Sequence, residues 1–377
     1  MVWRRARRLR TGTVILVLLV LLAGSGYVGW VAVQRSEPVA LPDPTGNHQV
    51  GRRTFEWTDA ARKDPFGDGQ RKLSVWLWYP VAKETTGRKV QYAPGLWTDL
   101  QLKPPASVFQ GSFDTVRDPA FDRVAVAPGR FPVVVLMPGL GLSAPMYASL
   151  AEDLASHGYL VAGVTPTYSA DLTVLGGQKV ESKEAAKPDD LEQQGDHLAG
   201  IWAADARFAG SMVAKQLPNS VLGVGTSYVG HSFGGAAALE ACRTDTRCAA
   251  AVDLDGVPYG EVVRKGVQAP ILLLGADDSC ITGVCGPDAR GDDDRDRTLS
   301  LLEASKGTSW CATIPGTSHY NFTDYGAYYL AAPLRQYLPL GSAGPRHALR
   351  VQNGYVSTFL AHAIHRAPAP GAPACSS

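Results

Sequence analysis

The feature that most constrains the fold is the segment Gly230-His231-Ser232-Phe233-Gly234-Gly235, which follows a short apolar run and precedes a helical pattern. It has the form G-x-S-x-G, in which a serine sits on a tight, strained turn between a strand and a helix. The flanking glycines let strand and helix approach closely because glycine has no Cβ atom. The turn also brings the serine oxygen near the unpaired N–H groups that begin the helix. The segment therefore predicts a strand–turn–helix unit that carries a nucleophilic serine, Ser232.

Short apolar runs recur on both sides of this turn, and helical patterns separate them. A continuous apolar run of this length is typical of a strand buried on both faces. We expect strands at residues 73–79, 132–137, 159–164, 226–230, 249–254, 270–274 and 309–314. We expect helices at residues 143–157, from 198 onward, from 236 onward, at 298–305 and at 346–364. The pattern predicts an α/β fold, with a mostly parallel central sheet and helices on both faces, in one domain of residues 51–365.

The N-terminus has a different composition. Residues 13–33 contain no charged side chain, which is long enough to cross a bilayer, and five arginines precede them. Residues 1–35 therefore predict a signal anchor with its N-terminus inside and the rest of the chain exported. Small residues at Leu22–Ser25 leave a cleaved signal peptide, and hence a secreted protein, as the alternative. Residues 36–50 are expected to form a linker.

Charge excludes one class of partner. The chain has 36 basic and 35 acidic residues, and six of the basic ones lie within the first 35 positions, where no acidic residue occurs. The remainder of the chain is therefore mildly acidic, which argues against a nucleic-acid-binding protein. No obligate protein partner is evident from the sequence.

The six cysteines are consistent with export. They contain no C-x-x-C pair and no metal-ligand cluster with histidine, so neither zinc nor another metal is expected. The short loops Cys242–Cys248 and Cys280–Cys285 could close as disulfides in an oxidising compartment. Six cysteines allow fifteen pairings, so sequence alone does not fix the connectivity, and unpaired buried thiols are the alternative.

A serine nucleophile needs a base, which an acid must orient. On a fold of this kind the order along the chain is serine, acid, histidine. His319 follows the last predicted strand, where it can reach the edge of the sheet at which strands end. The other downstream histidines fall on or near the last predicted helix, and they are His347, His362 and His365. His231 is expected to pack beside the serine without a chemical role.

Two aspartates could serve as the acid. Asp255 ends the predicted strand 249–254, and Asp278 follows the next strand, so both lie at the expected active edge. Asp253 lies within a buried strand and is expected to make a structural hydrogen bond. The acidic run Gly291–Asp296 is interpreted as a solvated surface turn, with a calcium site as the alternative.

Two backbone N–H groups are expected to form the oxyanion hole. One belongs to Phe233, the residue after the nucleophile, and the other to Leu140, in the glycine-containing loop Pro138–Gly141. Three polar segments lack periodicity. We expect residues 82–130 to form a long excursion, residues 169–195 a lid or insertion, and residues 366–377 a disordered Pro/Ala-rich tail.

Several segments together resemble the platelet-activating factor acetylhydrolase family of plasma and lysosomal type, within the α/β-hydrolases. The segments that carry the resemblance occur in order along residues 50–365, and they are Trp76–Pro80, Pro138–Gly141, Asp153–Gly158, Gly230–Gly235, Leu254–Gly256 and Ser318–Phe322. The resemblance, to a bacterial-like member, implies Ser232 as nucleophile, His319 as base and Asp255 as acid. It also implies Leu140 and Phe233 as oxyanion donors. Pro138 departs from the histidine that many relatives carry there.

The sequence thus predicts a serine esterase that works through an acyl-enzyme and needs no cofactor. The resemblance implies phospholipid esters with short or oxidised acyl chains as substrates, and the N-terminal helix implies contact with the membrane. One alternative is a cutinase- or lipase-like hydrolase of polyesters or triglycerides, because the spacing from Ser232 to Asp278 resembles that of secreted polyesterases. The others are a peptidase and a non-catalytic binding protein of the same fold.

Overall fold

The apolar runs of the sequence form the centre of a mixed β-sheet. The computed structural model describes residues 2–285, 292–369 and 375. Within them, nine strands form one sheet in the order β13-β12-β11-β10-β6-β7-β3-β2-β5. Strand β3 is antiparallel to β2 and β7, and the other neighbours are parallel. The predicted α/β class is confirmed.

The strands of the described chain are β1 (Val39–Ala40), β2 (Gln49–Lys63), β3 (Gln70–Val81), β4 (Val116–Arg117), β5 (Phe121–Asp122), β6 (Phe131–Met137), β7 (Leu160–Thr165), β8 (Thr173–Leu175), β9 (Gln178–Val180), β10 (Val221–His231), β11 (Cys248–Leu254), β12 (Ile271–Ala276) and β13 (Ser309–Ile314). The α-helices are α1 (Val2–Ser36), α2 (Ala148–Ser156), α3 (Leu191–Gln216), α4 (Phe233–Thr244), α5 (Val262–Lys265), α6 (Asp292–Ala304), α7 (Ala332–Arg335) and α8 (Pro345–His365).

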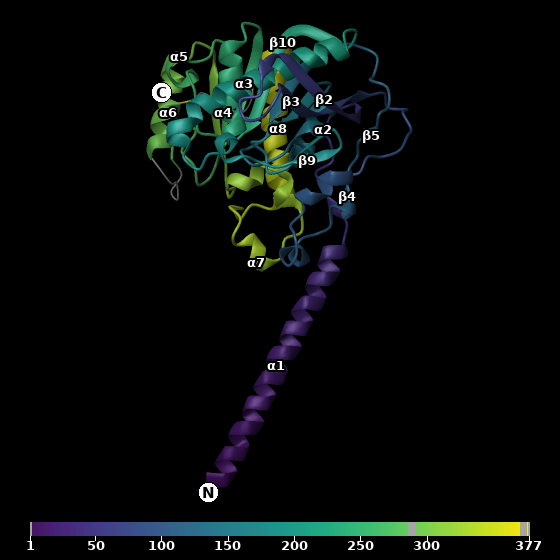
Figure 1. Ribbon diagram of the computed structural model, residues 1–377, viewed down its shortest axis with the longest axis vertical. Helices are drawn as coiled ribbons and strands as arrows, with labels where there is room; N and C mark the ends of the chain where they lie inside the picture. The colour runs from purple at the N-terminus through teal and green to yellow at the C-terminus, as the bar shows by residue number, and fades with distance from the viewer. Residues whose placement is uncertain (1, 286–291, 370–374, 376–377) are drawn as a thin grey trace.

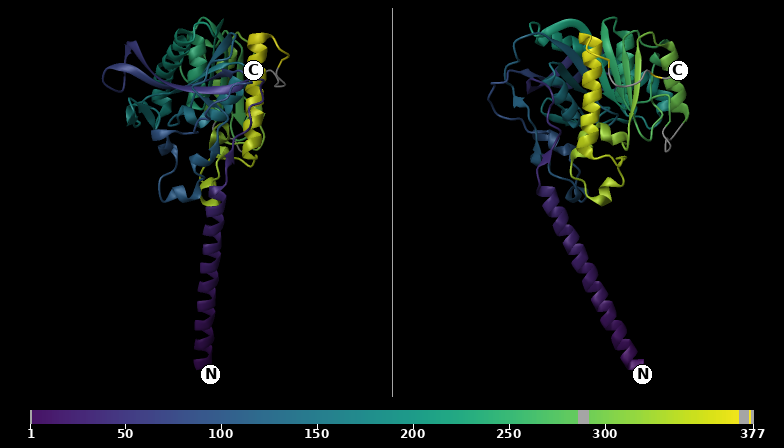
Figure 2. Two further views of the ribbon diagram at one scale, coloured as in Figure 1. Left: turned by 90° about the vertical axis from the view of Figure 1, so that its right-hand side faces the viewer. Right: turned by 180° about the vertical axis from the view of Figure 1, so that it is seen from behind.

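Helices cover both faces of the sheet (Figure 2). Successive side chains of a strand point to opposite faces, so β6 contributes to two separate cores. Val134 and Leu136 pack in a core with α2 and α8, whereas Val133 and Val135 pack in a second core with α3 and α4. Burial of β6 on both faces explains its unbroken apolar sequence.

Helix α1 projects from the domain as a single long rod (Figure 1). Residues Thr11–Ser36 are long and apolar enough to span a membrane, with a mean hydropathy of 2.3 and only 6% of the most apolar window buried. The helix meets the domain at its C-terminal end, where Val31 is buried and the ring of Trp30 lies 6.2 Å from that of Tyr329.

The prediction of a linker at residues 36–50 is only partly right. Strand β1 pairs with β4, Leu41 is buried, and β2 already begins at Gln49. The Thr45 side chain and backbone N–H both donate to Asp153 Oδ1, each at 2.8 Å. Apolar and hydrogen-bonding side chains therefore pack this segment against the domain.

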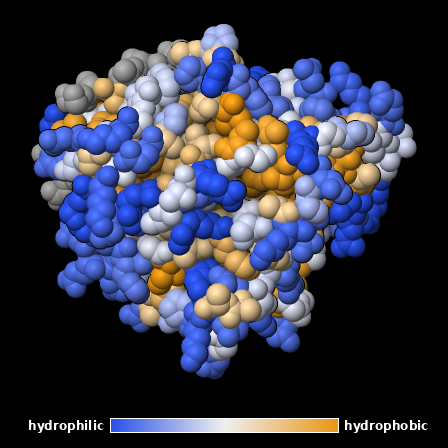
Figure 3. Space-filling view, turned by 90° about the horizontal axis from the view of Figure 1, so that it is seen from above, coloured by the Kyte–Doolittle hydropathy of each residue, from blue (hydrophilic) through white to orange (hydrophobic). Residues whose placement is uncertain are grey.

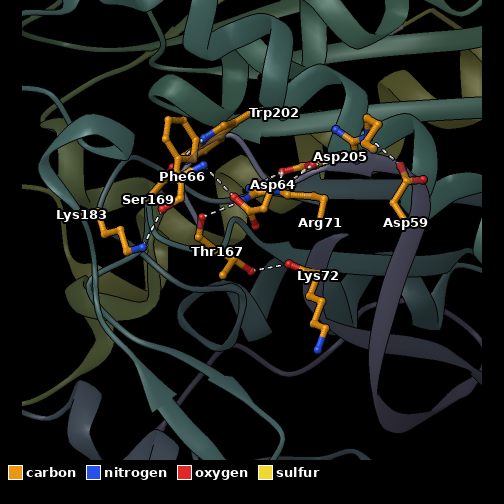
Figure 4. Close-up of polar contacts among 11 residues, drawn as sticks. Asp59, Asp64, Phe66, Arg71, Lys72, Thr167, Ser169, Lys183, Trp202 and Asp205 are labelled. Carbon is orange, nitrogen blue, oxygen red and sulfur yellow. Dashed lines mark hydrogen bonds and ion pairs between the residues drawn. The ribbon is translucent and has the colours of Figure 1, made fainter. Parts of the chain in front are cut away.

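The long β2–β3 hairpin is tied to α3 by a buried group of charges (Figure 4). Arg71 is fully buried and donates to Asp205 at 2.7 Å, to Asp64 at 3.2 Å and to the Thr167 carbonyl at 3.0 Å. Burial acts to lower the pKa of Arg71, but the two carboxylates outweigh it and leave this pKa raised. The group fixes the backbone that follows β7, which borders the site described below.

The predicted insertion at residues 169–195 contains regular structure. Strands β8 and β9 form a small hairpin, and α3 begins at Leu191, where the Asp190 carboxylate caps its N-terminus by accepting from Gln193 N. The helix therefore starts seven residues before the predicted Leu198. The segment is also held by polar contacts: Trp202 Nε1 donates to Ser169 Oγ at 3.1 Å (Figure 4). Residues 82–130 contain only short 3₁₀ helices and the two-residue strands β4 and β5, as expected for an excursion.

The prediction of a surface turn at Gly291–Asp296 is wrong. Helix α6 begins at Asp292, within the acidic run, because acidic residues are favoured in the first turn of a helix. Gly291 lies outside the described residues. Among the described residues, no group of three or more acidic, histidine or cysteine side chains is arranged to hold a metal ion.

Three disulfides close within the described residues. The pairs Cys242–Cys248 and Cys280–Cys285 form as predicted from their short loops, and Cys311 pairs with Cys375. The third disulfide fixes one residue of the predicted tail to β13. The prediction of disorder at residues 370–374 and 376–377 lies outside the described residues.

Candidate active site

The G-x-S-x-G segment forms the predicted turn between β10 and α4. Ser232 has φ 55° and ψ −129°, a strained conformation for a residue other than glycine. A Cβ atom at Gly230 would lie 1.9 Å from the Gly234 carbonyl oxygen, and one at Gly234 would lie 2.3 Å from that of Pro138. Both positions therefore require glycine, and the strained turn holds Ser232 at the end of β10.

The end of β10 lies at the same edge of the sheet as the ends of β6, β11, β12 and β13, because parallel strands share one C-terminal edge. Loop 138–141 follows β6, Asp255 follows β11, Asp278 follows β12, and His319 follows β13. The structure thus brings every candidate residue of the sequence to the same edge of the sheet.

His319 and Asp255 are in direct contact. His319 Nδ1 lies 2.6 Å from Asp255 Oδ2, and Asp255 Oδ1 accepts from Ala276 N at 2.7 Å. Burial acts to raise the pKa of Asp255, but the hydrogen bond and charge of His319 outweigh it and leave this pKa below its ordinary value. Asp255 is therefore ionised at neutral pH and can hold the proton on the Nδ1 side of His319. The Ser232 hydroxyl has no hydrogen bond to any described residue.

Asp278 has a different partner. Its Oδ2 accepts from Ser318 Oγ at 2.7 Å, so it acts on the residue before His319 and has no hydrogen bond to the His319 imidazole among the described residues. Asp278 therefore bonds the Ser318 side chain, whereas Asp255 contacts the imidazole of His319 itself.

Loop 138–141 offers one free donor. Gly139 N donates to the Tyr147 hydroxyl at 2.9 Å, Gly141 N to the Ser169 carbonyl at 3.0 Å, and Leu142 N to the Gly139 carbonyl at 2.9 Å. Within the described part of the chain, the N–H groups of Leu140 and Phe233 have no acceptor. These are the two groups that the sequence predicts as oxyanion donors.

A cavity of about 600 Å³ opens beside His319. The residues that line it come from the segments after β11, β12 and β13, from α6 and from the segment after α7, and they are Asp255, Val257, Asp278, Ser279, Ile281, Asp294, Ser318, His319, Gln336, Tyr337, Leu338 and Pro339. Its volume is in the range of sites that hold a small ligand.

The predicted role of His231 as a mere packing residue is incomplete. The imidazole is fully buried, as expected, but it also lies 2.8 Å from the Tyr147 hydroxyl through Nδ1 and 3.0 Å from the His319 carbonyl through Nε2. Tyr147 was not singled out by sequence analysis. No local pattern could have revealed it, since 84 residues separate it from His231.

The prediction for Asp253 is wrong. Its carboxyl oxygens are buried without a hydrogen-bond partner among the described residues, and Oδ1 lies 1.8 Å from where a Cβ atom at Gly235 would be. Burial, followed by the charge of Asp255, raises the pKa of Asp253 well above its ordinary value. The other downstream histidines lie on α8, as expected, and His362 Nδ1 bonds the Ala367 carbonyl at 2.7 Å.

Sequence families provide the first comparison with known proteins. The model of the family described as platelet-activating factor acetylhydrolase, isoform II, matches residues 33–194 and 189–367. The chain belongs to this family. The resemblance predicted from the sequence is thereby confirmed.

Individual members of the family are distant. A protein of Arthroderma benhamiae described as a probable 1-alkyl-2-acetylglycerophosphocholine esterase is 25% identical over 324 residues, which cover 78% of this chain and 79% of that protein. The platelet-activating factor acetylhydrolase of Gallus gallus is 22% identical over 370 residues, which cover 85% and 82% of the two chains.

A solved structure is similar to the chain in both fold and sequence. The ferulic acid esterase of Streptomyces cinnamoneus superposes with a TM-score of 0.71 at 28% identity, and the match covers 88% of this chain and 95% of that one. This similarity confirms the α/β-hydrolase fold expected for the family.

Proposed function

We propose that the chain hydrolyses phospholipid esters with short or oxidised acyl chains, with Ser232 as nucleophile, His319 as base and Asp255 as acid. That it is a serine esterase follows from membership in the family; the substrate and the residue roles are the proposal. The observation that carries the roles is the 2.6 Å contact between His319 and Asp255 at the sheet edge where Ser232 lies. The names of the lipid-acting relatives support the substrate class.

The reaction would proceed in two acyl transfers. As Ser232 Oγ attacks the ester carbonyl carbon, its proton moves to His319 Nε2, and Asp255 stabilises the resulting imidazolium. The oxyanion accepts hydrogen bonds from the N–H groups of Leu140 and Phe233. Collapse of the tetrahedral intermediate breaks the bond to the alcohol, which leaves as a lysophospholipid with the proton from His319.

Water then hydrolyses the acyl-enzyme. It attacks the acyl carbon and gives a proton to His319, and the second tetrahedral intermediate collapses to the free carboxylic acid. His319 returns the proton to Ser232 Oγ, which restores the enzyme. Asp255 remains ionised throughout, consistent with its lowered pKa.

The position of the cavity fits a substrate that lies in a membrane. Residues 336–339 line the cavity and directly follow α7, which lies at the end of the domain from which α1 projects (Figure 1). The aromatic side chain of Tyr337 is 79% exposed there. The opposite face, seen in Figure 3, is dominated by hydrophilic residues, with hydrophobic ones in limited patches.

We infer from this arrangement that α1 anchors the domain at the outer surface of the cell membrane, with the N-terminus inside. The arginines before the apolar stretch support that orientation. N-terminal sequencing of the protein recovered from membranes tests the anchor. An intact N-terminus is expected, whereas a mature chain that begins after Ser25 in the medium would show a cleaved signal and a secreted enzyme.

A second candidate function is the hydrolysis of aromatic acid esters. It is favoured by the ferulic acid esterase, whose identity to this chain, 28%, exceeds that of the two lipid-acting relatives described above. The two candidates share the site and the mechanism and differ only in the acyl group.

The experiment that separates them uses the purified full chain in detergent. Its rates are measured on phosphatidylcholines with an acetyl, a medium or a long acyl group at the second glycerol position, and on methyl ferulate. We expect the acetyl lipid to be the best substrate and Ser232→Ala to be inactive. Preference for methyl ferulate would establish the second candidate, and activity retained by Ser232→Ala would contradict both.

A further inference from the structure

A buried hydrogen-bonded chain joins the two halves of the candidate site. Gly139 N, in the loop after β6, donates to the Tyr147 hydroxyl at 2.9 Å. The Tyr147 hydroxyl lies 2.8 Å from His231 Nδ1, and His231 Nε2 lies 3.0 Å from the carbonyl oxygen of His319. This series of hydrogen bonds therefore begins one residue before Leu140, a proposed oxyanion donor, and ends on the backbone of His319, the proposed base.

The chemistry of the three groups fixes the direction of every hydrogen bond. A carbonyl oxygen can only accept, so His231 must carry its hydrogen on Nε2. In a neutral imidazole Nδ1 is then an acceptor, and the Tyr147 hydroxyl must donate to it. The phenol oxygen remains free to accept from Gly139 N. With a neutral imidazole, every donor in this series has one acceptor, and no other arrangement satisfies all three contacts.

The surroundings keep His231 neutral. Both His231 and Tyr147 are buried, with exposed fractions of 0% and 1%. Burial, followed by the nearby His319, lowers the pKa of His231 well below its ordinary value. The His231 ring packs 4.6 Å from the His319 ring, between centroids, and is stacked on Phe322 at 6.0 Å. A neutral ring at this position adds no repulsion to the imidazolium that forms on His319.

Packing alone does not explain why Tyr147 and His231 are hydrogen-bonded in this way. A histidine that only filled space would not need two oriented partners, and an apolar side chain would satisfy the packing without a polar group to bury. A buried polar network whose members are all satisfied holds one geometry in preference to others.

We propose that Tyr147 and His231 are positioning residues that set the distance between the oxyanion loop and the catalytic histidine. They touch no reacting atom. Tyr147 fixes the peptide at Gly139, and with it the direction of the Leu140 N–H, while His231 fixes the backbone of His319. The inference rests on the proposed function of Ser232 and His319.

Four variants test the proposal. Tyr147→Phe removes the hydroxyl, His231→Ala removes the whole link, and His231→Gln retains a donor close to the Nε2 position. Tyr228→Phe is the matched control, because it removes a partly buried hydroxyl from the same strand as His231. That hydroxyl donates at 2.7 Å to Asp245, which lies at the opposite end of α4 from Ser232. For each full-length variant, kcat and KM for p-nitrophenyl acetate and the thermal midpoint are measured.

Misplacement of a catalytic group by about 1 Å costs on the order of 100-fold in rate. We therefore expect Tyr147→Phe to lower kcat about 10- to 100-fold with KM nearly unchanged, and His231→Ala to lower it at least as much. His231→Gln should recover part of the loss. Tyr228→Phe should lower the thermal midpoint as much as Tyr147→Phe while leaving kcat nearly unchanged. Equal kcat values for Tyr147→Phe and Tyr228→Phe would overturn the proposal.

A measurement that does not depend on turnover accompanies the kinetics. Nitrogen-15 NMR of the histidine side chains should show His231 as the neutral Nε2–H form throughout the range in which an ordinary histidine titrates. A signal from the Nδ1–H form, or titration in that range, would contradict the hydrogen-bonded chain. If the wild type hydrolyses no ester, the proposed function fails, and the NMR result still decides whether the hydrogen bonds from Tyr147 through His231 to His319 are present.

Discussion

Replacing Asp255 by asparagine retains the shape of the side chain but removes its charge. In the structure Asp255 Oδ2 lies 2.6 Å from His319 Nδ1, and the carboxylate is buried. Two unit charges about 4 Å apart attract by about 4 kcal/mol at an effective dielectric constant of about 20. That attraction acts only when His319 is protonated, so it stabilises the transition state and not the resting enzyme. At about 1.4 kcal/mol for each factor of ten, its loss corresponds to about a 1,000-fold slower reaction.

The amide of the variant adds a second effect. Its NH2 group can donate to Nδ1, which favours the tautomer of His319 that cannot accept the Ser232 proton, and the loss can then approach about 10,000-fold. The assay is kcat for p-nitrophenyl acetate, with KM expected to change little because the ground-state contacts of the substrate are retained. Folding is monitored by the thermal midpoint.

Asp278→Asn is the control for this prediction. Asp278 lines the same cavity but accepts from Ser318 Oγ instead of from His319, so we expect a loss of kcat below about 10-fold. The reasoning is refuted if Asp278→Asn loses more activity than Asp255→Asn. That result would assign the acid to Asp278, as in the polyesterase alternative.

Three further predictions concern folding and stability. Gly234→Ala should give little soluble protein, because the new Cβ atom would lie 2.3 Å from the Pro138 carbonyl oxygen; normal yield and activity would disprove the need for glycine. Cys311→Ser opens the bond to Cys375, which closes a long loop, and should lower the free energy of unfolding in urea by about 2–4 kcal/mol; no change would contradict a structural role. Burial raises the pKa of Asp324 to about 8. Between about pH 4 and pH 8 this carboxyl group therefore keeps its proton in the folded state and loses it in the unfolded state. The free energy of unfolding should fall as pH rises through that range. Asp324→Asn, which cannot ionise, should flatten that pH dependence; an unchanged slope would show that other groups cause it.

The central strands could be predicted because burial on both faces leaves a direct trace in the sequence. Strand β6 is buried throughout and appears as an unbroken apolar run. Strand β2 alternates between buried and exposed residues and carries several charges, so its 15 residues gave no such signal. The burial of Val39 and Leu41 against the domain could not be predicted from the sequence either, because a segment of prolines and small residues shows no hydrophobic periodicity.

The site was predictable where chemistry is tied to chain order. The G-x-S-x-G segment marked Ser232 as the candidate nucleophile, and the position after the last strand marked His319 as the candidate base. Spacing alone did not separate Asp255 from Asp278, because both follow neighbouring strands at one edge. Their difference appears only in three dimensions, where Asp255 contacts the imidazole at 2.6 Å and Asp278 contacts Ser318 at 2.7 Å.

The contact between Tyr147 and His231 was beyond sequence reasoning for a related reason. Tyr147 precedes α2 and His231 ends β10, and each has an apolar neighbourhood that predicts burial alone. Only the packing of α2 beside the oxyanion loop brings the hydroxyl to the imidazole. Polar contacts over such separations follow from the completed fold and not from a local pattern.

The most direct test of the account is to trap the acyl-enzyme. The full-length protein is mixed with p-nitrophenyl acetate, quenched with acid within the first turnover, digested and examined by mass spectrometry. We predict one acetyl group, on the peptide that contains Ser232, formed together with a burst of p-nitrophenol and absent from Ser232→Ala. Acetylation of another residue, or an undiminished burst from Ser232→Ala, would contradict the assignment of Ser232 as the nucleophile.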